Sequence, residues 1–236
     1  MSRPANIFSR ATSSARELGI KRSFQTLISI IDDAVFDFRL GTDTCAAIPQ
    51  SKLQVMAPEN QSEAKPYVMT RALALRHAFA KSPASKHLRF NDIGCGKGKV
   101  VIAAALAGFT HVRGLDFAPE LIEIAEKNLE CMKSKLPQDV RVTVERADVT
   151  KAEYGPEDCV FFLYNPFCGT VMRGFCKRLT ESLLEHPRRI WIIYAHPAYI
   201  DVMLESLPVE VKNRSAYGGF DFVYLENRLE VPSAEL

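Results

Sequence analysis

The fold of this chain is decided by ten residues, Arg89 to Gly98, which read RFNDIGCGKG. Residues 87–93, with Leu88, Phe90 and Ile93, predict a strand, and three glycines follow at Gly94, Gly96 and Gly98. Glycine adopts backbone conformations that other residues avoid, so the chain can turn sharply here and approach a ligand closely. The next apolar segment predicts a helix over residues 99–108, whose first amide groups are free to bind a ligand.

The spacing of these glycines argues against a dinucleotide site. The pattern is G-x-G-x-G rather than G-x-G-x-x-G, and Asp92 precedes the first glycine by two residues. A carboxylate at this place repels a pyrophosphate and attracts an ammonium group. The turn therefore points to a ligand with a cationic amino-acid end and disfavours a dinucleotide-dependent oxidoreductase. A tight turn without any ligand is the alternative.

Strands and helices alternate along the rest of the chain. Strands are expected at residues 112–117, 140–144, 159–164 and 190–194, and helices at residues 120–133, 172–185 and 199–207. Two last strands, 209–213 and 220–226, flank a turn at residues 216–219. This order predicts a doubly wound α/β sheet with an antiparallel edge element, in which ligands bind beyond the carboxyl ends of the strands.

Two more acids end the next two strands. Asp116 lies 24 residues after Asp92, a separation at which a carboxylate can accept both hydroxyl groups of a ribose. Phe117 beside it can pack on an adenine face or in the core. Asp148 can accept the exocyclic amine of adenine while a neighbouring backbone amide, such as that of Val149, donates to a ring nitrogen. Asp148 can equally cap the segment that follows it.

In this order the motifs resemble those of class I S-adenosylmethionine-dependent methyltransferases. The resemblance rests on residues 92–98, Asp116, Asp148 and Tyr164-Asn165-Pro166-Phe167, and it covers residues 65–228. With Tyr67-Val68-Met69-Thr70 ahead of the first strand, the chain is similar to a mostly uncharacterised bacterial group. It is more distantly similar to the non-SET histone-lysine and ATP-synthase-subunit lysine methyltransferases. The resemblance implies a seven-stranded Rossmann-like sheet, with six parallel strands plus one antiparallel, and S-adenosyl-L-methionine as cofactor.

The resemblance also implies a role for each motif. By position, the three glycines line the methionine portion of the cofactor, and Asp92 orders that loop and the amino group. Asp116 holds the ribose and Asp148 the adenine amine. Tyr67 and Thr70 lie over the cofactor as a lid.

Asn165-Pro166-Phe167 stands where amino-methylating relatives carry an Asn/Asp-Pro-Pro-aromatic run. There the side-chain amide and a prolyl-held carbonyl accept hydrogen bonds from an NH2 group, and the aromatic ring stacks on it. This chain has one proline before Phe167, which weakens an interpretation as a methyltransferase of nucleic-acid adenine or of glutamine. We expect these three residues to be catalytic, with Asn165 orienting the acceptor, although Asn-Pro is also an ordinary turn.

His196 and Tyr194, at the end of the fifth expected strand, are predicted to face the same cleft. His196 can take up a proton at neutral pH, although His196-Pro197 is also typical of a surface turn.

The composition argues against a nucleic-acid-binding protein, a disulfide-rich protein and a membrane-spanning protein. The 236 residues are 47% hydrophobic and 25% charged, as in an ordinary globular protein, and the net charge of +2 makes nucleic acid an improbable partner. Six cysteines without a CxxC pair predict neither a zinc site nor a disulfide framework, and favour a cytoplasmic protein without a metal. The longest stretch without a formal charge, Cys159–Met172, has 14 residues, whereas a membrane span needs about 20.

The N-terminal part differs from the rest, and we divide the chain into a helical and loop extension, residues 1–64, and a methyltransferase domain, residues 65–236. Residues 1–31 carry five cations and one acid, and apolar residues recur there at helical spacing. This favours an amphipathic helix that packs on the domain or contacts a partner protein over a transit peptide. Residues 41–66 are expected to be loop, and a helix is expected over residues 67–81.

The leading hypothesis is therefore a methyltransferase that transfers a methyl group to a nitrogen of a protein side chain or a small molecule. An O-methyltransferase of a small metabolite is one alternative, and it would use a base such as His196. A non-catalytic subunit that binds S-adenosylmethionine is the other.

Overall fold

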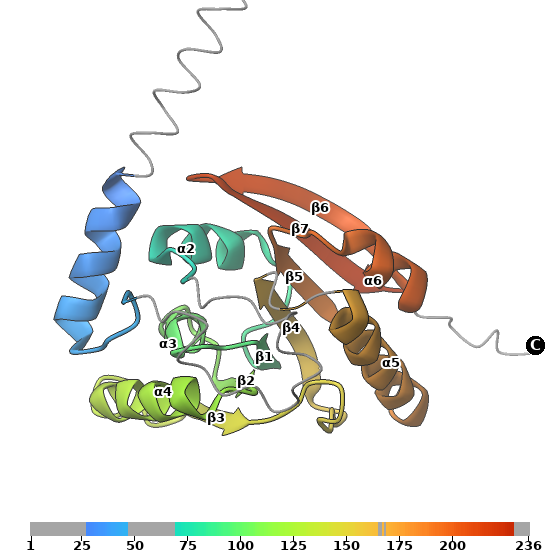
Figure 1. Ribbon diagram of the computed structural model, residues 1–236, viewed down its shortest axis with the longest axis horizontal. Coiled ribbons are helices and arrows are strands. Elements are labelled where there is room, and N and C mark those ends of the chain that lie inside the picture. The colour runs from blue at the N-terminus through green and yellow to red at the C-terminus, as the bar shows by residue number, and fades with distance from the viewer. Residues whose placement is uncertain (1–26, 47–68, 165–166, 168, 229–236) are drawn as a thin grey trace, which may run out of the picture.

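A seven-stranded sheet in the order β3-β2-β1-β4-β5-β7-β6 forms the centre of the structure (Figure 1). The computed structural model describes residues 27–46, 69–164, 167 and 169–228. The strands are β1 (Arg89–Ile93), β2 (His111–Asp116), β3 (Arg141–Arg146), β4 (Asp158–Tyr164), β5 (Trp191–Ala195), β6 (Val209–Tyr217) and β7 (Phe220–Asn227). β7 is antiparallel to both β5 and β6, and the other pairs are parallel. This confirms the predicted sheet of six parallel strands and one antiparallel strand.

Helices cover both faces of the sheet. They are α2 (Ala72–Lys81), α3 (Lys99–Leu106), α4 (Pro119–Met132), α5 (Gly169–Glu185) and α6 (Ile200–Ser206), with a further helix over residues 27–40. In Figure 1, α2, α3 and α4 lie on one side of the sheet and α5 and α6 on the other. None of the helices in the described part of the chain is long and apolar enough to cross a membrane.

The central strands are apolar on both faces, because each face packs against a helical layer. In β4, Val160 and Phe162 pack into the core below α2 and α3, whereas Phe161 and Leu163 pack into the core below α5. This alternation follows from the two-residue period of a strand. It places the strand ends, rather than the strand faces, where a ligand can reach them.

The hairpin at the edge of the sheet turns at Gly218 and Gly219, whose φ angles are 57° and 89°. Two consecutive positive φ values are typical of a tight two-residue turn between antiparallel strands, for which glycine is favoured. The turn lies within the predicted residues 216–219. β6 continues to Tyr217 instead of ending at Asn213 as expected.

The prediction that α2 begins at residue 67 is wrong. Arg71 is extended, and the helix begins at Ala72, whose amide donates a hydrogen bond of 2.9 Å to Asp33 Oδ1. An acid that lies 39 residues upstream in the chain cannot be found from local periodicity. Residues 67 and 68 lie outside the described part of the chain.

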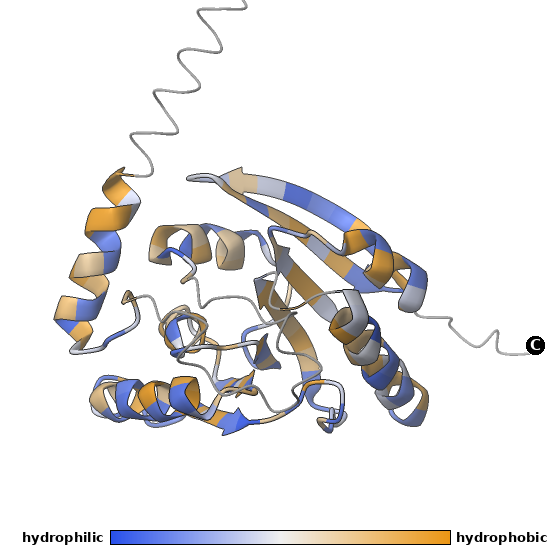
Figure 2. Ribbon diagram, in the orientation of Figure 1, coloured by the Kyte–Doolittle hydropathy of each residue, from blue (hydrophilic) through white to orange (hydrophobic). Residues whose placement is uncertain are grey.

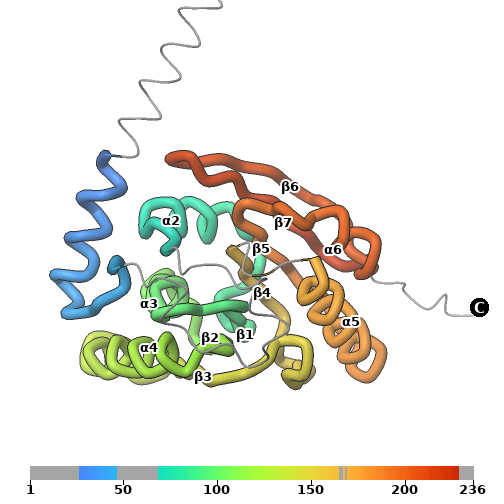
Figure 3. Tube along the Cα trace, in the orientation of Figure 1, coloured from blue at the N-terminus to red at the C-terminus, as the bar shows by residue number. Residues whose placement is uncertain are grey.

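The N-terminal helix (residues 27–40) is attached to the sheet domain by buried charges. Its trace passes beside α2, α3 and α4 (Figure 3), where Phe36 packs with Ile102 and Met132. Asp33 Oδ1 lies 2.7 Å from Lys99 Nζ, and only 2% of either side chain is exposed. Arg71 adds a second cation, 3.3 Å from the other oxygen of Asp33.

The loop after this helix makes a second attachment. Asp43 Oδ2 lies 3.0 Å from the buried Lys97 Nζ. The side chain of Asn128 on α4 joins the two segments, because its oxygen accepts from the Asp43 amide and its nitrogen donates to the Asp43 and Lys97 carbonyls. Lys97, between two of the glycines, and Lys99, directly after the last one, thus hold the N-terminal segment on the domain.

Lys99→Met should lower the free energy of unfolding by about 3–5 kcal/mol, because it leaves the buried Asp33 carboxylate without its closest cation. Arg76→Met is the matched control, since Arg76 pairs with the neighbouring Asp32 but has 53% of its side chain exposed. Arg76→Met should lower the free energy of unfolding by no more than about 1 kcal/mol. Urea unfolding measures this free energy for both variants. The double variant with Asp33→Asn should lose less than Lys99→Met alone, and equal losses for the lysine and arginine variants would contradict the prediction.

Candidate functional site

The three glycines of the motif all adopt a left-handed backbone. The φ angles are 81° at Gly94, 53° at Gly96 and 81° at Gly98, a region that residues with a side chain rarely occupy. The amides of Gly94 and Cys95 donate to the carbonyl of Leu115 at 2.8 and 2.9 Å, which ties the turn to the end of β2. The turn is therefore a defined backbone structure at the carboxyl ends of β1 and β2.

Close packing surrounds the turn. A side chain at Gly98 would place its Cβ 3.3 Å from the Cβ of Ala125 on α4. At Gly114 in β2, a Cβ would lie 2.7 Å from Val101 Cγ2 and 2.9 Å from Cys95 Cβ. The sequence analysis did not single out Gly114, and the only signal for it is a glycine inside an apolar strand pattern.

Asp116 connects the end of β2 to the turn. Its Oδ2 accepts a hydrogen bond of 2.9 Å from the Gly96 amide, and its Oδ1 accepts one of 3.0 Å from the Ala118 amide. Burial raises the pKa of this carboxyl, although backbone hydrogen bonds from Ala118, Gly96 and Phe117 act in the opposite direction. The two oxygens of a carboxylate can together accept about four hydrogen bonds, so the group retains capacity for a hydroxyl group of a ligand.

Asp92 is the least satisfied charged group at this edge of the sheet. It is buried at the end of β1, and its Oδ2 has no hydrogen-bond partner in the described part of the chain. Burial and the nearby charge of Asp116 raise its pKa well above the usual value. A buried carboxylate oxygen without a partner is costly, and such groups are rare in folded proteins. Its position fits a ligand that brings an ammonium group.

The remaining predicted cofactor residues lie further from the turn. Asp148 caps the turn that follows β3, because its Oδ1 accepts from the amide and the hydroxyl of Thr150 at 3.0 and 2.7 Å. Val149 is buried in the core below α5. Phe117, partly exposed, packs against Ala118 and Leu121. The other oxygen of Asp148 lies 3.6 Å from Nζ of the exposed Lys151, and the amides of residues 150, 151 and 152 all donate to Asp148 within the turn.

The expected lid and acceptor residues are described only in part. Thr70 is buried just ahead of α2, whereas Tyr67, Asn165 and Pro166 lie outside the described residues. Phe167 is buried in the core below α5, with its ring centroid 6.5 Å from that of Phe175.

Three aromatic rings gather at the carboxyl ends of β4 and β5 and the start of β7. The ring of His196 lies 5.5 Å from that of Tyr164 and 5.0 Å from that of Phe220, and Tyr164 lies 5.6 Å from Phe220. His196 has a φ of 46°, the one positive value outside glycine in the described chain, and its amide donates to the Asp221 carbonyl. Strained backbone of this kind is found preferentially at functional sites.

The prediction that Tyr194 faces this cleft is wrong. Tyr194 is completely buried in the core below α5 and α6, and its hydroxyl accepts a hydrogen bond from the Tyr199 amide. The cause is its register in β5, where neighbouring residues point to opposite faces of the sheet.

The sequence analysis also missed Lys97, Lys99 and their acidic partners. The signal was present, since two lysines stand between and after the glycines, and Asp32-Asp33 interrupts an apolar helical pattern. Pairing across 66 residues, however, is visible only in three dimensions.

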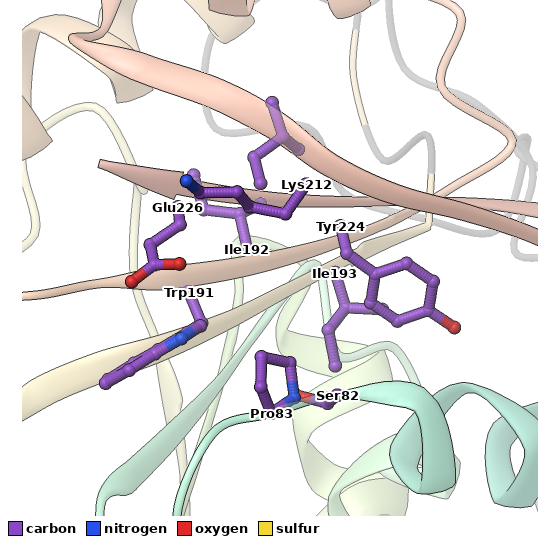
Figure 4. A pocket seen from close by; sticks show the side chains of 9 residues that line it. Ser82, Pro83, Trp191, Ile192, Ile193, Lys212, Tyr224 and Glu226 are labelled. Carbon is purple, nitrogen blue, oxygen red and sulfur yellow. The ribbon is translucent and has the colours of Figure 1, made fainter. Parts of the chain in front are cut away.

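A small hollow lies at the opposite edge of the sheet, away from the glycine turn. Ser82, Pro83, Trp191, Ile193 and Tyr224 line it (Figure 4). Trp191 is the first residue of β5, so the hollow is at the amino ends of the parallel strands. Its volume of about 10 Å³ is that of a single water molecule, and it is therefore no ligand site.

Comparison with known proteins agrees with this geometry. Residues 84–182 match a family model described as a methyltransferase domain. A search of curated protein sequences found no match. Among solved structures, an RNA methyltransferase from Salinibacter ruber in complex with S-adenosyl-L-homocysteine is 19% identical, with a TM-score of 0.51 over 70% of this chain and 97% of that chain. TrmN from Thermus thermophilus is 16% identical, with a TM-score of 0.52 over 68% of this chain and 49% of that chain.

Structural similarity at these identities shows the fold. Residues 84–182 match the model of a methyltransferase domain, a match that implies S-adenosyl-L-methionine as the cofactor, and the sheet has the Rossmann-like fold of class I methyltransferases. Oδ2 of Asp92, which has no hydrogen-bond partner among the described residues, lies beside the glycine turn and fits the amino group of this cofactor. Because one fold serves many substrates, the acceptor does not follow from it.

Asp92→Asn should stabilise the protein in the absence of cofactor, and the gain should grow with pH. Because the folded-state pKa of Asp92 is raised, its contribution to stability is complete below the ordinary value of 3.8 and is lost as pH rises through the raised pKa. Asparagine has no such titration. Urea unfolding from about pH 5 to pH 8 tests this, and parallel curves for the two proteins would contradict it.

Proposed function

We propose that the chain transfers a methyl group from S-adenosyl-L-methionine to a nitrogen atom of a protein side chain or a small molecule. The cofactor part is supported by the buried Oδ2 of Asp92, which has no hydrogen-bond partner in the described part of the chain and lies beside three left-handed glycines. The nitrogen acceptor is supported by the order of residues at the end of β4, where Asn165-Pro166-Phe167 follows Tyr164.

Each part of the cofactor has a proposed partner at the carboxyl edge of the sheet. Asp92 would bind the ammonium group, which returns a counter-charge to a carboxyl that burial otherwise disfavours. Asp116 would hold the ribose by accepting a hydroxyl hydrogen bond with the capacity that remains on its carboxylate. Gly94 and Gly96 would let the backbone approach the methionine portion, and Asp148 would accept the adenine amine.

The bound sulfonium supplies an activated methyl group, so the protein chiefly has to align the acceptor with it. In the step itself, a nitrogen lone pair forms the new C–N bond while the S–C bond breaks and its electron pair stays on sulfur. The nitrogen gains positive charge and then releases its proton to water or to a nearby base. Only a neutral amine has the lone pair, so an ammonium acceptor must first lose a proton.

The chain's own residues at this place fit such a step. We propose that the Asn165 side-chain oxygen accepts an N–H hydrogen bond and thereby directs the lone pair of the acceptor. The rings of Tyr164 and His196 lie at the ends of the two neighbouring strands, and aromatic faces favour a cationic nitrogen. No covalent intermediate with the protein is needed.

A second candidate function is methylation of a hydroxyl group, which the strained His196 favours. A hydroxyl is a weak nucleophile until a base removes its proton, and imidazole is suited to that role near neutral pH. The two reactions therefore differ in which side chain they need, Asn165 or His196. A non-catalytic cofactor-binding subunit would need neither.

Isothermal titration of the purified chain with S-adenosyl-L-methionine, S-adenosyl-L-homocysteine and NAD is the first test of the proposal. Both adenosyl ligands should bind and NAD should not. Asp116→Ala should weaken adenosyl binding by about 1–3 kcal/mol through lost hydrogen bonds to a charged acceptor. Because Asp116 also holds the glycine turn, the variant's unfolding curve must be recorded alongside. Unchanged affinity in a folded variant would show that the ribose is bound elsewhere.

Asn165→Ala should lower methyl transfer about a hundredfold, while cofactor affinity changes little, because the acceptor loses its alignment. His196→Ala is the comparison, and its rate should fall by much less. The assay follows transfer of a labelled methyl group to proteins and small molecules of a cell lysate, and hydrolysis of the product identifies the methylated atom. A larger loss in His196→Ala, with label on oxygen, would overturn the nitrogen assignment. Tight cofactor binding without any transfer would support the non-catalytic alternative.

A further inference from the structure

The N-terminal helix (residues 27–40) buries two polar residues beside Phe36 and exposes most of its large apolar residues. Ser29 and Asp33 are buried against the domain, and Asp33 makes the ion pair with Lys99. The opposite side carries large apolar residues with at least 41% of their surface exposed, and Phe38 reaches 90%. These residues are Leu27, Ile28, Ile30, Ile31, Val35 and Phe38, which we call the apolar face. Figure 2 shows the helix at the edge of the molecule, with apolar turns along its length.

An ordinary surface helix buries its apolar stripe and exposes its charges. Here Phe36 is buried, but most of the large apolar residues are exposed while Asp33 is buried. This orientation has a cause in the domain, because buried Lys99 and the half-buried Arg71 both require the Asp33 carboxylate. The helix therefore cannot roll over without leaving charges unpaired. Contiguous exposed apolar surface of this kind marks an interaction site.

In the sequence, a basic segment precedes the apolar face. Residues 1–26 contain Arg3, Arg10, Arg16, Lys21 and Arg22 and a single acid, Glu17. At the other end of the helix Arg39 is exposed, and Lys135, three residues after α4, donates to the carbonyls of residues 39 and 40. The acids of the helix are already engaged within the protein, since Asp32 pairs with Arg76 and Asp37 accepts from the loop after the helix.

We propose that the apolar face binds the surface of an anionic lipid bilayer, with the helix lying in the interface. An apolar helical face flanked by cations is the combination that favours such binding, because acyl chains take up the apolar side chains and acidic headgroups attract the cations. The helix lies on the membrane and does not span it.

Charge argues against a second copy of the chain as the occupant. In a two-fold symmetric dimer the same patch meets itself. Antiparallel helices would bring the residue-27 end of one helix, to which the basic sequence is joined, toward Arg39 and Lys135 of the other copy. Parallel helices would bring the two residue-27 ends together. In either arrangement positive charges of the two copies would lie close together and repel each other. The acidic headgroups of a bilayer would instead attract the cations at both ends of the helix.

Flotation of the full-length chain with vesicles tests the proposal, after mass spectrometry has verified that residues 1–26 are present. The protein should bind phosphatidylcholine–phosphatidylserine vesicles at least about tenfold more tightly than pure phosphatidylcholine, and high salt should weaken binding. The double variant Ile31→Ser/Phe38→Ser should lose binding at least about tenfold. Leu184→Ser on α5, where the leucine is 77% exposed, is the matched control and should bind normally.

Three outcomes would overturn the proposal. Absence of vesicle binding by the intact chain is the first, and it would mean that other residues of the chain or another protein cover the face. Equal loss in Leu184→Ser is the second, because binding would then be unspecific. The third is a dimer in sedimentation velocity that Ile31→Ser/Phe38→Ser converts to a monomer, which would assign the face to a second copy. Urea unfolding verifies that each variant is folded, and none of these measurements depends on methyl transfer.

Discussion

The buried ion pair between Asp33 and Lys99 is the interaction on which the arrangement around the glycine turn depends. Lys99 is the first residue of α3, directly after Gly98, and its side chain is buried. A buried ammonium group is costly without a partner of opposite charge, and the partner of Lys99 comes from a helix far upstream. The same carboxylate caps α2 at Ala72. One side chain thus joins the N-terminal helix, α2 and α3, and thereby limits how the turn can move.

The two carboxylates of the turn illustrate how stability and binding conflict. Asp116 is satisfied by backbone amides and supports the turn, whereas Asp92 is equally buried and has an oxygen without a partner among the residues that the structure describes. In the empty protein this oxygen costs stability, and a ligand with an ammonium group would remove the cost. Groups that are unfavourable in the free protein and favourable in the complex are what distinguishes a binding site from a well-packed turn.

The sequence analysis succeeded wherever local pattern and backbone geometry decide the structure. The strand–glycine–helix order from Arg89 onward, the alternation that follows and the final hairpin are all set by short-range rules, and the sheet agrees with them. The predictions were wrong where a residue distant in the sequence determines the local structure. The start of α2 depends on Asp33, and the inward direction of Tyr194 depends on register within the sheet. The same distinction applies to the site residues. Gly96 and Asp116 were predictable neighbours, because the ends of adjacent parallel strands lie together, whereas Lys97 and Lys99 pair with acids that are distant in the sequence.

The orientation of the N-terminal helix follows from the same buried charges. If Lys99 were apolar, the N-terminal helix could pack its apolar face inward in the usual way, and its acids would lie in water. Because two cations of the domain require Asp33, the apolar residues are left outside, next to a segment rich in arginine. The contacts that hold the turn beside α3 and the exposure of the apolar face are therefore two consequences of one constraint. A partner that binds the apolar face therefore contacts the helix that carries Asp33. Through the ion pair of Asp33 with Lys99, this helix is joined to the first residue after the glycine turn.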